Sequence, residues 1–145
     1  MPSVKFWAGS SWKGKTRLHF LPKNLKGWQY LDFIKKKAEP DLLRLCPIWL
    51  QDKEGFHTAT VVKKYLKKSP LIPLQHWPSR SPDLNWQENV WELLAQGVRR
   101  TIKGLKKVVE EEWEKIDIGT IRKLIVSMPR RMDAVIDADG GNTKY

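Results

Sequence analysis

Two acidic residues, Asp52 and Glu88, stand where carboxylates can share a metal ion. Asp52 ends an apolar run at 47–52 that predicts a strand, and Glu88 lies at the start of a predicted helix, with 35 residues between them. Ligands collect at the carboxyl ends of strands in open α/β sheets, so these two carboxylates would form a hard oxygen site for Mg²⁺ or Mn²⁺. Such ions activate an attacking hydroxyl and stabilise the leaving oxygen of a phosphodiester. The alternative is that Asp52 is a strand-end turn residue and Glu88 a helix cap.

The stretch around Glu88 changes from a rigid loop to a helix. Pro78 and Pro82 fix their own φ angles and disfavour helix at the residues before them. Apolar residues then recur at helical spacing up to Gly104, which is a suitable helix stop. Asn85 precedes Glu88 by three positions, which is the pattern of a capping box. In that interpretation the Glu88 carboxylate accepts a hydrogen bond from the Asn85 amide.

The composition indicates an anionic partner. The 145 residues carry 27 Lys and Arg against 16 Asp and Glu, which gives a net charge of +11 and a pI of about 9.8. This excess favours nucleic acid and, less often, a membrane surface; a solvated basic face is the alternative. Cys46 is the single cysteine, so a reducing, intracellular compartment is expected. The sequence shows no apolar leader and no run of membrane-spanning length, so no membrane partner is expected.

The first half of the chain predicts strands alternating with helices. The expected elements are a hairpin of strands at 4–10 and 16–21, a helix at 24–38, a strand at 47–52, a helix at 58–66 and a short strand at 70–75. Pro40 is expected to end the first helix. The run at 47–52 does not alternate, which is typical of a strand buried on both faces.

Beyond Gly104 the chain is predicted to be helical. Two apolar stripes predict helices over 105–116 and 121–125, and Pro129 is expected to open a last helix. The residues that this last helix is expected to bury are Met132, Val135 and Ile136. Strand–helix–strand units followed by helices indicate an α/β fold in a single domain, residues 1–145.

Four segments of the chain resemble one family. Residues 77–91, WPSRSPDLNWQENVW, are similar to the WPxxSPDLNPIENLW signature of mariner-type transposases. Residues 7–21 resemble the family's VWGG-type hairpin, and 49–60, WLQDKEGFHTAT, resemble its QQDNDPKHTS segment. Residues 127–145 are similar to its C-terminal ending. The chain is identified by this resemblance as the C-terminal part of a mariner-superfamily DDE transposase catalytic domain.

The resemblance implies an activity and the residues that carry it. Asp52 and Glu88 map onto the second and third acids of the DDE triad, with Mg²⁺ or Mn²⁺ as cofactor. The implied fold is α/β and ribonuclease H-like, with a mixed sheet, flanking helices and a helical C-terminal extension. The implied activity is cleavage of DNA at transposon ends and strand transfer into target DNA, in the nucleus and in a homodimer. The expected DNA contacts are Lys53, His57, Arg80, Lys63 and Lys64.

The sequence departs from the family pattern in several places. Lys53-Glu54-Gly55-Phe56 stand where the family has Asn-Asp-Pro-Lys after the second Asp, and the spacing between the two acids is one residue longer than the commonest form. The usual Pro-Ile before the third acid is Trp86-Gln87. The family's first Asp lies on a strand upstream of the hairpin, and residues 1–31 contain neither Asp nor Glu. The acids that follow are poor substitutes because they fall in or beside predicted helices; they are Asp32, Glu39 and Asp41.

We therefore expect a truncated domain without the family's first catalytic strand. A catalytically inactive remnant that binds nucleic acid, or an inert fragment, is the alternative to an endonuclease. In a ribonuclease H-like sheet the first strand is central. The hairpin is accordingly expected either to pair directly with the strand at 47–52 or to leave a gap there.

Overall fold

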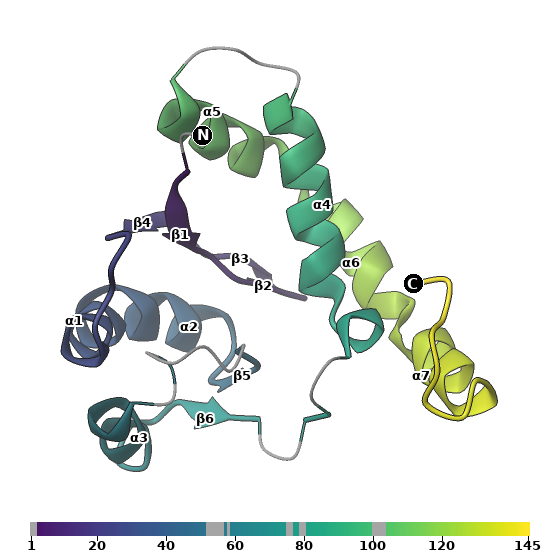
Figure 1. The fold of residues 1–145 in the computed structure, drawn as a ribbon, viewed down its shortest axis with the longest axis horizontal. Coiled ribbons are helices and arrows are strands. Elements are labelled where there is room, and N and C mark those ends of the chain that lie inside the picture. The colour runs from purple at the N-terminus through teal and green to yellow at the C-terminus, as the bar shows by residue number, and fades with distance from the viewer. Residues whose placement is uncertain (1–2, 52–56, 58, 75–76, 79–80, 100–103) are drawn as a thin grey trace. The chain divides into compact units, whose positions relative to one another are not determined.

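Two compact units make up the protein (Figure 1). The structure, a computed structural model, describes residues 3–51, 57, 59–74, 77–78, 81–99 and 104–145. The first unit contains residues 3–8 and 15–77, and the second contains residues 9–14 and 78–145. The chain therefore passes from one unit to the other more than once. That residues 1–145 form a single domain stays a prediction.

An antiparallel hairpin opens the chain, as the sequence predicts. β1 (Lys5–Trp7) pairs with β4 (His19–Leu21), and the register places the phenylalanines of the two strands opposite each other. Two shorter strands, β2 (Ser10–Ser11) and β3 (Gly14–Lys15), pair with each other toward the tip. Aromatic residues such as those of β1 and β4 favour the pleated conformation.

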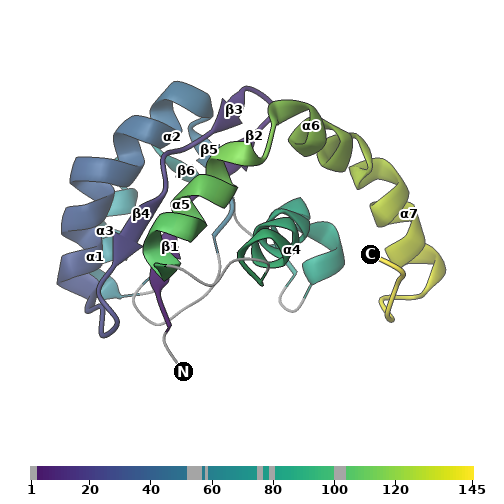
Figure 2. The ribbon, with the colours of Figure 1, turned by 90° about the horizontal axis from the view of Figure 1, so that it is seen from above.

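A long helix follows, and Pro40 does not end it. α1 (Gly27–Phe33) continues through a π-helical turn (Ile34–Ala38) into α2 (Glu39–Leu45), as Figure 2 shows. The prediction of a helix end at Pro40 is therefore wrong. Proline has no amide hydrogen, and its ring crowds the carbonyl one turn earlier; the wider π turn directly before it relieves both conflicts. The first amide of α2 donates to the first carbonyl of the π turn.

A parallel pair of strands forms a second small sheet in the first unit. β5 (Ile48–Trp49) pairs with β6 (Ile72–Pro73), and α3 (Thr60–Leu66) lies between them in the chain. The amides of Ile72 and Leu74 donate hydrogen bonds of 2.8 Å to β5 and the residue before it. This strand–helix–strand unit agrees with the predicted elements, because parallel strands need a crossover connection.

β5 is buried on one face, not on both. Trp49 is 6% exposed, whereas Ile48 is 53% exposed. The prediction of a strand buried on both faces is therefore wrong. Successive side chains of a strand point to opposite faces, and the hydrophobic core of this unit covers only the face that carries Trp49.

The hairpin and the parallel pair are separate sheets. Among the strands that the structure describes, β1 is hydrogen-bonded to β4 and β5 to β6. Direct pairing of the hairpin with the strand before Asp52, one of the two expected arrangements, is not seen among them. The observed sheets are thus both antiparallel and parallel, as a mixed sheet would be, but each has two strands.

The core of the first unit lies between the long helix, α3 and β5. Its buried members are Tyr30, Ile34, Ala38, Leu42, Trp49, Val62, Leu66 and Leu71. Gly27 allows α1 and α3 to approach closely, since a Cβ at this position would lie 2.5 Å from the Ala59 Cβ. Trp7 of β1 meets Phe33 edge-on, with ring centroids 5.3 Å apart, so the hairpin packs against the same helix.

The described part of the second unit is mainly helical. A 3₁₀ turn (Pro82–Leu84) leads into α4 (Trp86–Arg99), which is followed by α5 (Leu105–Lys115), α6 (Ile118–Val126) and α7 (Met128–Asp137). These bounds confirm the predicted helices, whereas the predicted continuation of α4 toward a stop at Gly104 involves residues 100–103, which lie outside the described residues. In Figures 1 and 2, α7 continues from the end of α6 toward the C-terminus.

α4 packs against α5 and α6 through apolar side chains. Val90 and Leu94 of α4 are buried, as are Trp113 of α5 and Ile121 of α6. The rings of Trp91 and Trp113 lie 5.7 Å apart between centroids. α4 is thus held along its length by the apolar core of the second unit.

α7 buries a different face from the one predicted. Met132 is 46% exposed and Ile136 is 73% exposed, so the prediction that they are buried is wrong. The buried residues of the helix are Met128 and Arg131. The helix turns Arg131 inward because that side chain has hydrogen-bond acceptors there, and this rotates the apolar positions outward.

Candidate active site

Glu88 lies in the first turn of α4, on a capped helix end. The Asn85 side chain accepts from the Gln87 amide at 3.1 Å, and its carbonyl accepts from the Glu88 amide at 3.2 Å. The Asn85 amide donates to Pro82 at 3.0 Å, so it has a partner within the 3₁₀ turn. The helix cap predicted at the Asn85 side chain is confirmed, whereas the reciprocal bond of a capping box, from the Asn85 amide to the Glu88 carboxylate, is not seen, because that amide donates to Pro82. The Glu88 side chain is exposed, at the end of the helix where the dipole favours a carboxylate.

The tip of the hairpin supports this turn. The Ser10 hydroxyl donates to Gln87 Oε1 at 2.5 Å and accepts from Trp86 Nε1 at 3.2 Å. Arg122 of α6 donates to the Trp12 carbonyl at 3.1 Å, which ties the tip to a second helix. Trp86 and Gln87, the two residues that replace the family's usual Pro-Ile, thus hold the tip together with Arg122.

Asp52 lies outside the described residues, but its neighbours on both sides meet one side chain. The Tyr30 hydroxyl donates to Gln51 Oε1 at 3.1 Å. The His57 ring lies 4.7 Å from the Tyr30 ring between centroids. Tyr30 is fully buried in α1, so the chain is anchored on the core directly before Asp52 and again at His57.

The other half of the predicted site stays a prediction. Lys53 and Arg80 lie outside the described residues, as Asp52 does, so the expected proximity of Asp52 and Glu88 is untested. Within the described ranges, no group of three or more His, Cys, Asp or Glu side chains could hold a metal ion. A site that includes Asp52 falls outside that set.

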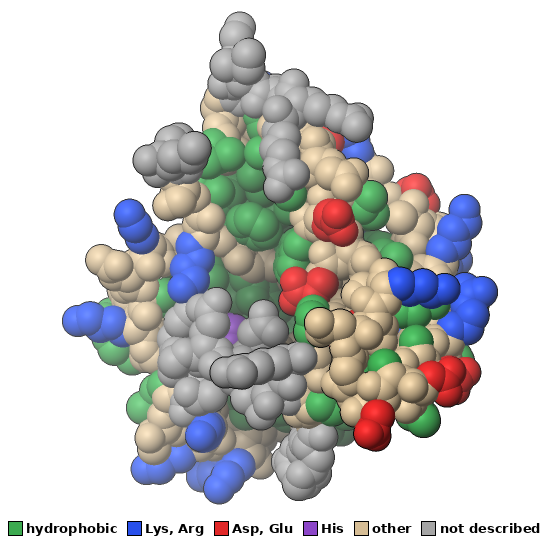
Figure 3. All heavy atoms as spheres, turned by 45° about the vertical axis from the view of Figure 1, so that its right-hand side comes forward, with side chains coloured by type: hydrophobic (Ala, Val, Ile, Leu, Met, Phe, Trp, Pro, Cys, Tyr) green, Lys and Arg blue, Asp and Glu red, His purple; other side chains and the backbone are tan. Residues whose placement is uncertain are grey.

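A row of lysines covers the outer face of α3 and its end. Lys63 and Lys64 are exposed, and so are Lys67 and Lys68. Lys and Arg side chains gather at the lower left of Figure 3, at the level of α3. The exposed face of this helix is confirmed, whereas its contact with DNA stays a prediction. His57, another expected DNA contact, is half-buried against Tyr30.

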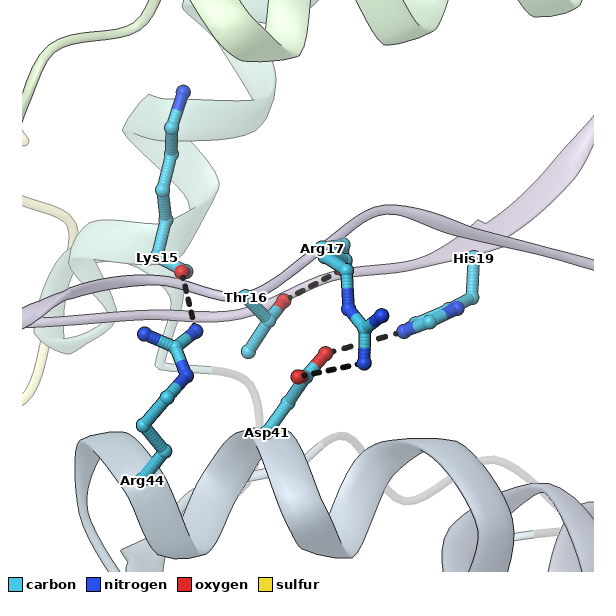
Figure 4. Close-up of polar contacts among 6 residues, drawn as sticks. All are labelled: Lys15, Thr16, Arg17, His19, Asp41 and Arg44. Carbon is cyan, nitrogen blue, oxygen red and sulfur yellow. Dashed lines mark hydrogen bonds and ion pairs between the residues drawn. The ribbon is translucent and has the colours of Figure 1, made fainter.

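Asp41 is a buried acid that connects two elements of the fold (Figure 4). It is 4% exposed, and its two carboxylate oxygens accept from His19 Nε2 at 3.2 Å and from Arg17 Nη2 at 3.4 Å. Burial alone would raise the pKa of Asp41, but the hydrogen bonds from His19 and Arg17 and the charge of Arg17 lower it below its usual value. The carboxylate therefore joins α2 to the hairpin.

The neighbouring acids are also engaged in local contacts. Glu39 accepts from the hydroxyls of Tyr65 and Ser69, each at 2.8 Å. Asp32 pairs with Lys36 at 2.8 Å, one helical turn away. These contacts agree with the expectation that Asp32, Glu39 and Asp41 make poor replacements for a first catalytic acid.

Arg131 and Asn89 were not among the predicted site residues. Arg131 Nη1 donates to Asn89 Oδ1 at 2.8 Å, in the same first turn of α4 that carries Glu88. The spacing held a signal for this contact, because Arg131 follows the buried Met128 by three residues and so shares its face of α7.

Comparison with known proteins places these residues in a family. The sequence profile of the DDE superfamily endonucleases matches residues 2–109. The Tc1 transposase of Caenorhabditis elegans is 41% identical over 102 residues, which cover 68% of this chain and 37% of that protein. The Tcb2 transposase of Caenorhabditis briggsae is 30% identical over 150 residues, which cover 99% of this chain and 55% of that protein. The chain spans about half the length, or less, of these relatives.

Solved structures agree with the sequence comparison. The catalytic domain of Mos1 mariner transposase superposes with a TM-score of 0.80 at 18% identity, over 98% of this chain and 82% of that one. A structure of the same domain with Raltegravir and Mn gives the same values. The ribonuclease H-like fold predicted from the sequence is confirmed.

The chain belongs to the DDE superfamily endonuclease family. Within that family, the sequence relatives and the Mos1 fold confirm the resemblance to the catalytic domain of mariner-superfamily DDE transposases.

Proposed function

We propose that this chain supplies the second and third acids, Asp52 and Glu88, of a DDE endonuclease domain that cleaves DNA at transposon ends and joins it to target DNA. The observation that carries the proposal is the exposed Glu88 carboxylate on a capped and braced first turn of α4, in a chain of this family. The relatives named transposases, at up to 41% identity, support the same activity.

The donors fit a hard divalent cation. Asp52 and Glu88 both offer carboxylate oxygens, the ligands that Mg²⁺ and Mn²⁺ prefer. Such an ion, when bound, offsets the negative charge that builds up on the oxygens of a phosphodiester. Two structures of the Mos1 transposase catalytic domain are named as containing Mn and Mg, which supports the choice of metal.

Two carboxylates are too few to coordinate a pair of metal ions fully. The next acids in the sequence, Asp32, Glu39 and Asp41, are engaged in other contacts. We therefore infer that residues 1–145 alone do not cleave DNA.

DNA is the proposed partner. The net charge of +11 and the exposed Lys63 and Lys64 support binding to the phosphate backbone, weak and indifferent to sequence. No helix in the described ranges is long and apolar enough to cross a membrane. We also propose that the protein is nuclear and forms a homodimer, because the family implies both. Light scattering of the purified chain tests the dimer.

Binding of Mn²⁺, followed by the electron paramagnetic resonance signal of the unbound ion, tests the proposed acids. We expect Glu88→Gln and Asp52→Asn each to weaken Mn²⁺ binding by about ten-fold or more, because each removes a charged ligand. Glu92→Gln is the matched control, since Glu92 is an exposed acid one turn further along α4. Equal binding by all three variants would reject the site.

The second candidate is a catalytically inactive protein that binds nucleic acid. The local contacts of Asp32, Glu39 and Asp41 favour it for residues 1–145 taken alone, because these acids are engaged elsewhere. A chain that binds DNA but loses no Mn²⁺ affinity in Glu88→Gln would identify this alternative.

A further inference from the structure

Arg131 is a buried cation at the inner face of α7. It is 2% exposed, and burial lowers the pKa of its guanidinium group. Arginine nevertheless stays charged in proteins. A buried charge is costly unless hydrogen-bond acceptors surround it, so the partners of Arg131 show what the residue holds in place.

The guanidinium group joins four segments of the second unit. Its Nε donates to Ser127 Oγ at 2.7 Å, at the start of its own helix. Its Nη1 donates to the Asp83 carbonyl at 3.2 Å, in the 3₁₀ turn, and to Asn89 Oδ1 at 2.8 Å, in α4. Its central carbon lies 4.8 Å from the centre of the Tyr145 ring.

The C-terminal segment holds the same 3₁₀ turn from its other side. Thr143 Oγ1 donates to Asp83 Oδ2 at 3.1 Å and accepts from the Tyr145 amide at 3.3 Å. The Asp83 carbonyl is thus held by Arg131 and its carboxylate by Thr143. The turn that leads into α4 is fixed at two points.

We propose that Arg131 is a positioning residue for the Glu88 carboxylate. Side chains at successive helical positions point about 100° apart, so holding Asn89 toward Arg131 sets the direction in which Glu88 points. The first turn of a helix lacks part of its backbone hydrogen bonding and frays unless other groups hold it. Arg131 supplies that hold, at Asn89 and at Asp83. This inference rests on the proposed role of Glu88 as a metal ligand.

Amide hydrogen exchange of the whole chain tests the hold directly. In Asn89→Ala, which removes the acceptor and keeps the rest of the network, we expect amides of residues 83–91 to exchange about ten-fold faster, because a hydrogen bond to a charged group is lost. Amides of α5 should be unchanged. Arg131→Met should give the same local pattern, and Arg130→Met, an exposed neighbour, should give none. Unchanged exchange, or faster exchange throughout the unit, would overturn the proposal, because the second result marks a merely structural role.

Mn²⁺ binding separates this inference from the proposed function. If Glu88→Gln weakens Mn²⁺ binding, Asn89→Ala and Arg131→Lys should weaken it too, although both variants retain Glu88. Unchanged Mn²⁺ affinity in these two variants would reject the positioning role of Arg131 but not the metal site. If Glu88→Gln leaves Mn²⁺ binding unchanged, the proposed function fails. The exchange measurement then still decides whether Arg131 holds the first turn of α4.

Discussion

Replacing Asp41 with asparagine should destabilise the first unit measurably. The carboxylate is 4% exposed and accepts from His19 at 3.2 Å and Arg17 at 3.4 Å. An asparagine at this position keeps one acceptor oxygen and turns an amide donor toward the other partner. Arg17 is 73% exposed in its side chain, so its ion pair contributes little. The loss is therefore about 1.5–3 kcal/mol, the range for a hydrogen bond to a charged group.

The effect should depend on pH in one direction. Because the folded protein lowers the pKa of Asp41, the unfolded chain takes up the proton first on acidification. The stabilisation from this carboxylate is thus fully present above the pKa of an unfolded Asp, about 3.9, and is lost as the pH falls through the lower folded value. The wild type and Asp41→Asn should converge in stability at the acid end.

Thermal unfolding followed by circular dichroism measures both effects. At pH 7 we expect Tm to fall by about 5–10 °C in Asp41→Asn. Asp32→Asn is the control, because it removes an exposed ion pair with Lys36, worth about 0.2–0.5 kcal/mol. Equal Tm values for the two variants at pH 7, or a difference between Asp41→Asn and the wild type that grows on acidification, would refute the reasoning.

Two further substitutions test the packing of α1 and the DNA-binding surface. Gly27→Ala should lower the free energy of unfolding by about 1–3 kcal/mol in urea titrations, despite the better helix propensity of alanine, because the new Cβ would lie 2.5 Å from the Ala59 Cβ. An unchanged free energy would mean that α1 and α3 separate easily. The double variant Lys63→Gln, Lys64→Gln should lower the slope of log DNA affinity against log salt by up to about 1.8, since each phosphate contact contributes about 0.9; an unchanged slope would show that this face of α3 does not contact DNA.

Elements with a local pattern were predictable from the sequence. The hairpin follows from aromatic strand residues around a turn, and α3 follows from apolar spacing that places Val62 and Leu66 in the core. The helix cap at Asn85 also has a local signature. In each case the residues that decide the structure are close together in the chain.

The features that were predicted wrongly or not at all depend on contacts between residues that are distant in the sequence. The π turn before Pro40 is stabilised by a core that spans three helices and a strand, so the local rule for proline did not decide the outcome. Arg131 faces inward because Asn89 and Asp83 meet it, and these lie 42 and 48 positions earlier. The apolar pattern from which the buried face of α7 was predicted does not reveal these distant partners. For the site, sequence reasoning placed Glu88 at a helix start but did not find the residues that hold it there.

The hairpin tip has a consequence for how this protein folds. Residues 9–14 belong to the second unit, and their partners Trp86, Gln87 and Arg122 lie 76, 77 and 110 positions later. Such non-local pairings slow folding, because a long loop must close before the contacts form. During synthesis from the N-terminus, the tip must therefore wait until most of the chain has emerged. Cutting the gene between the units would leave the second unit without the strand segment that braces its first helix.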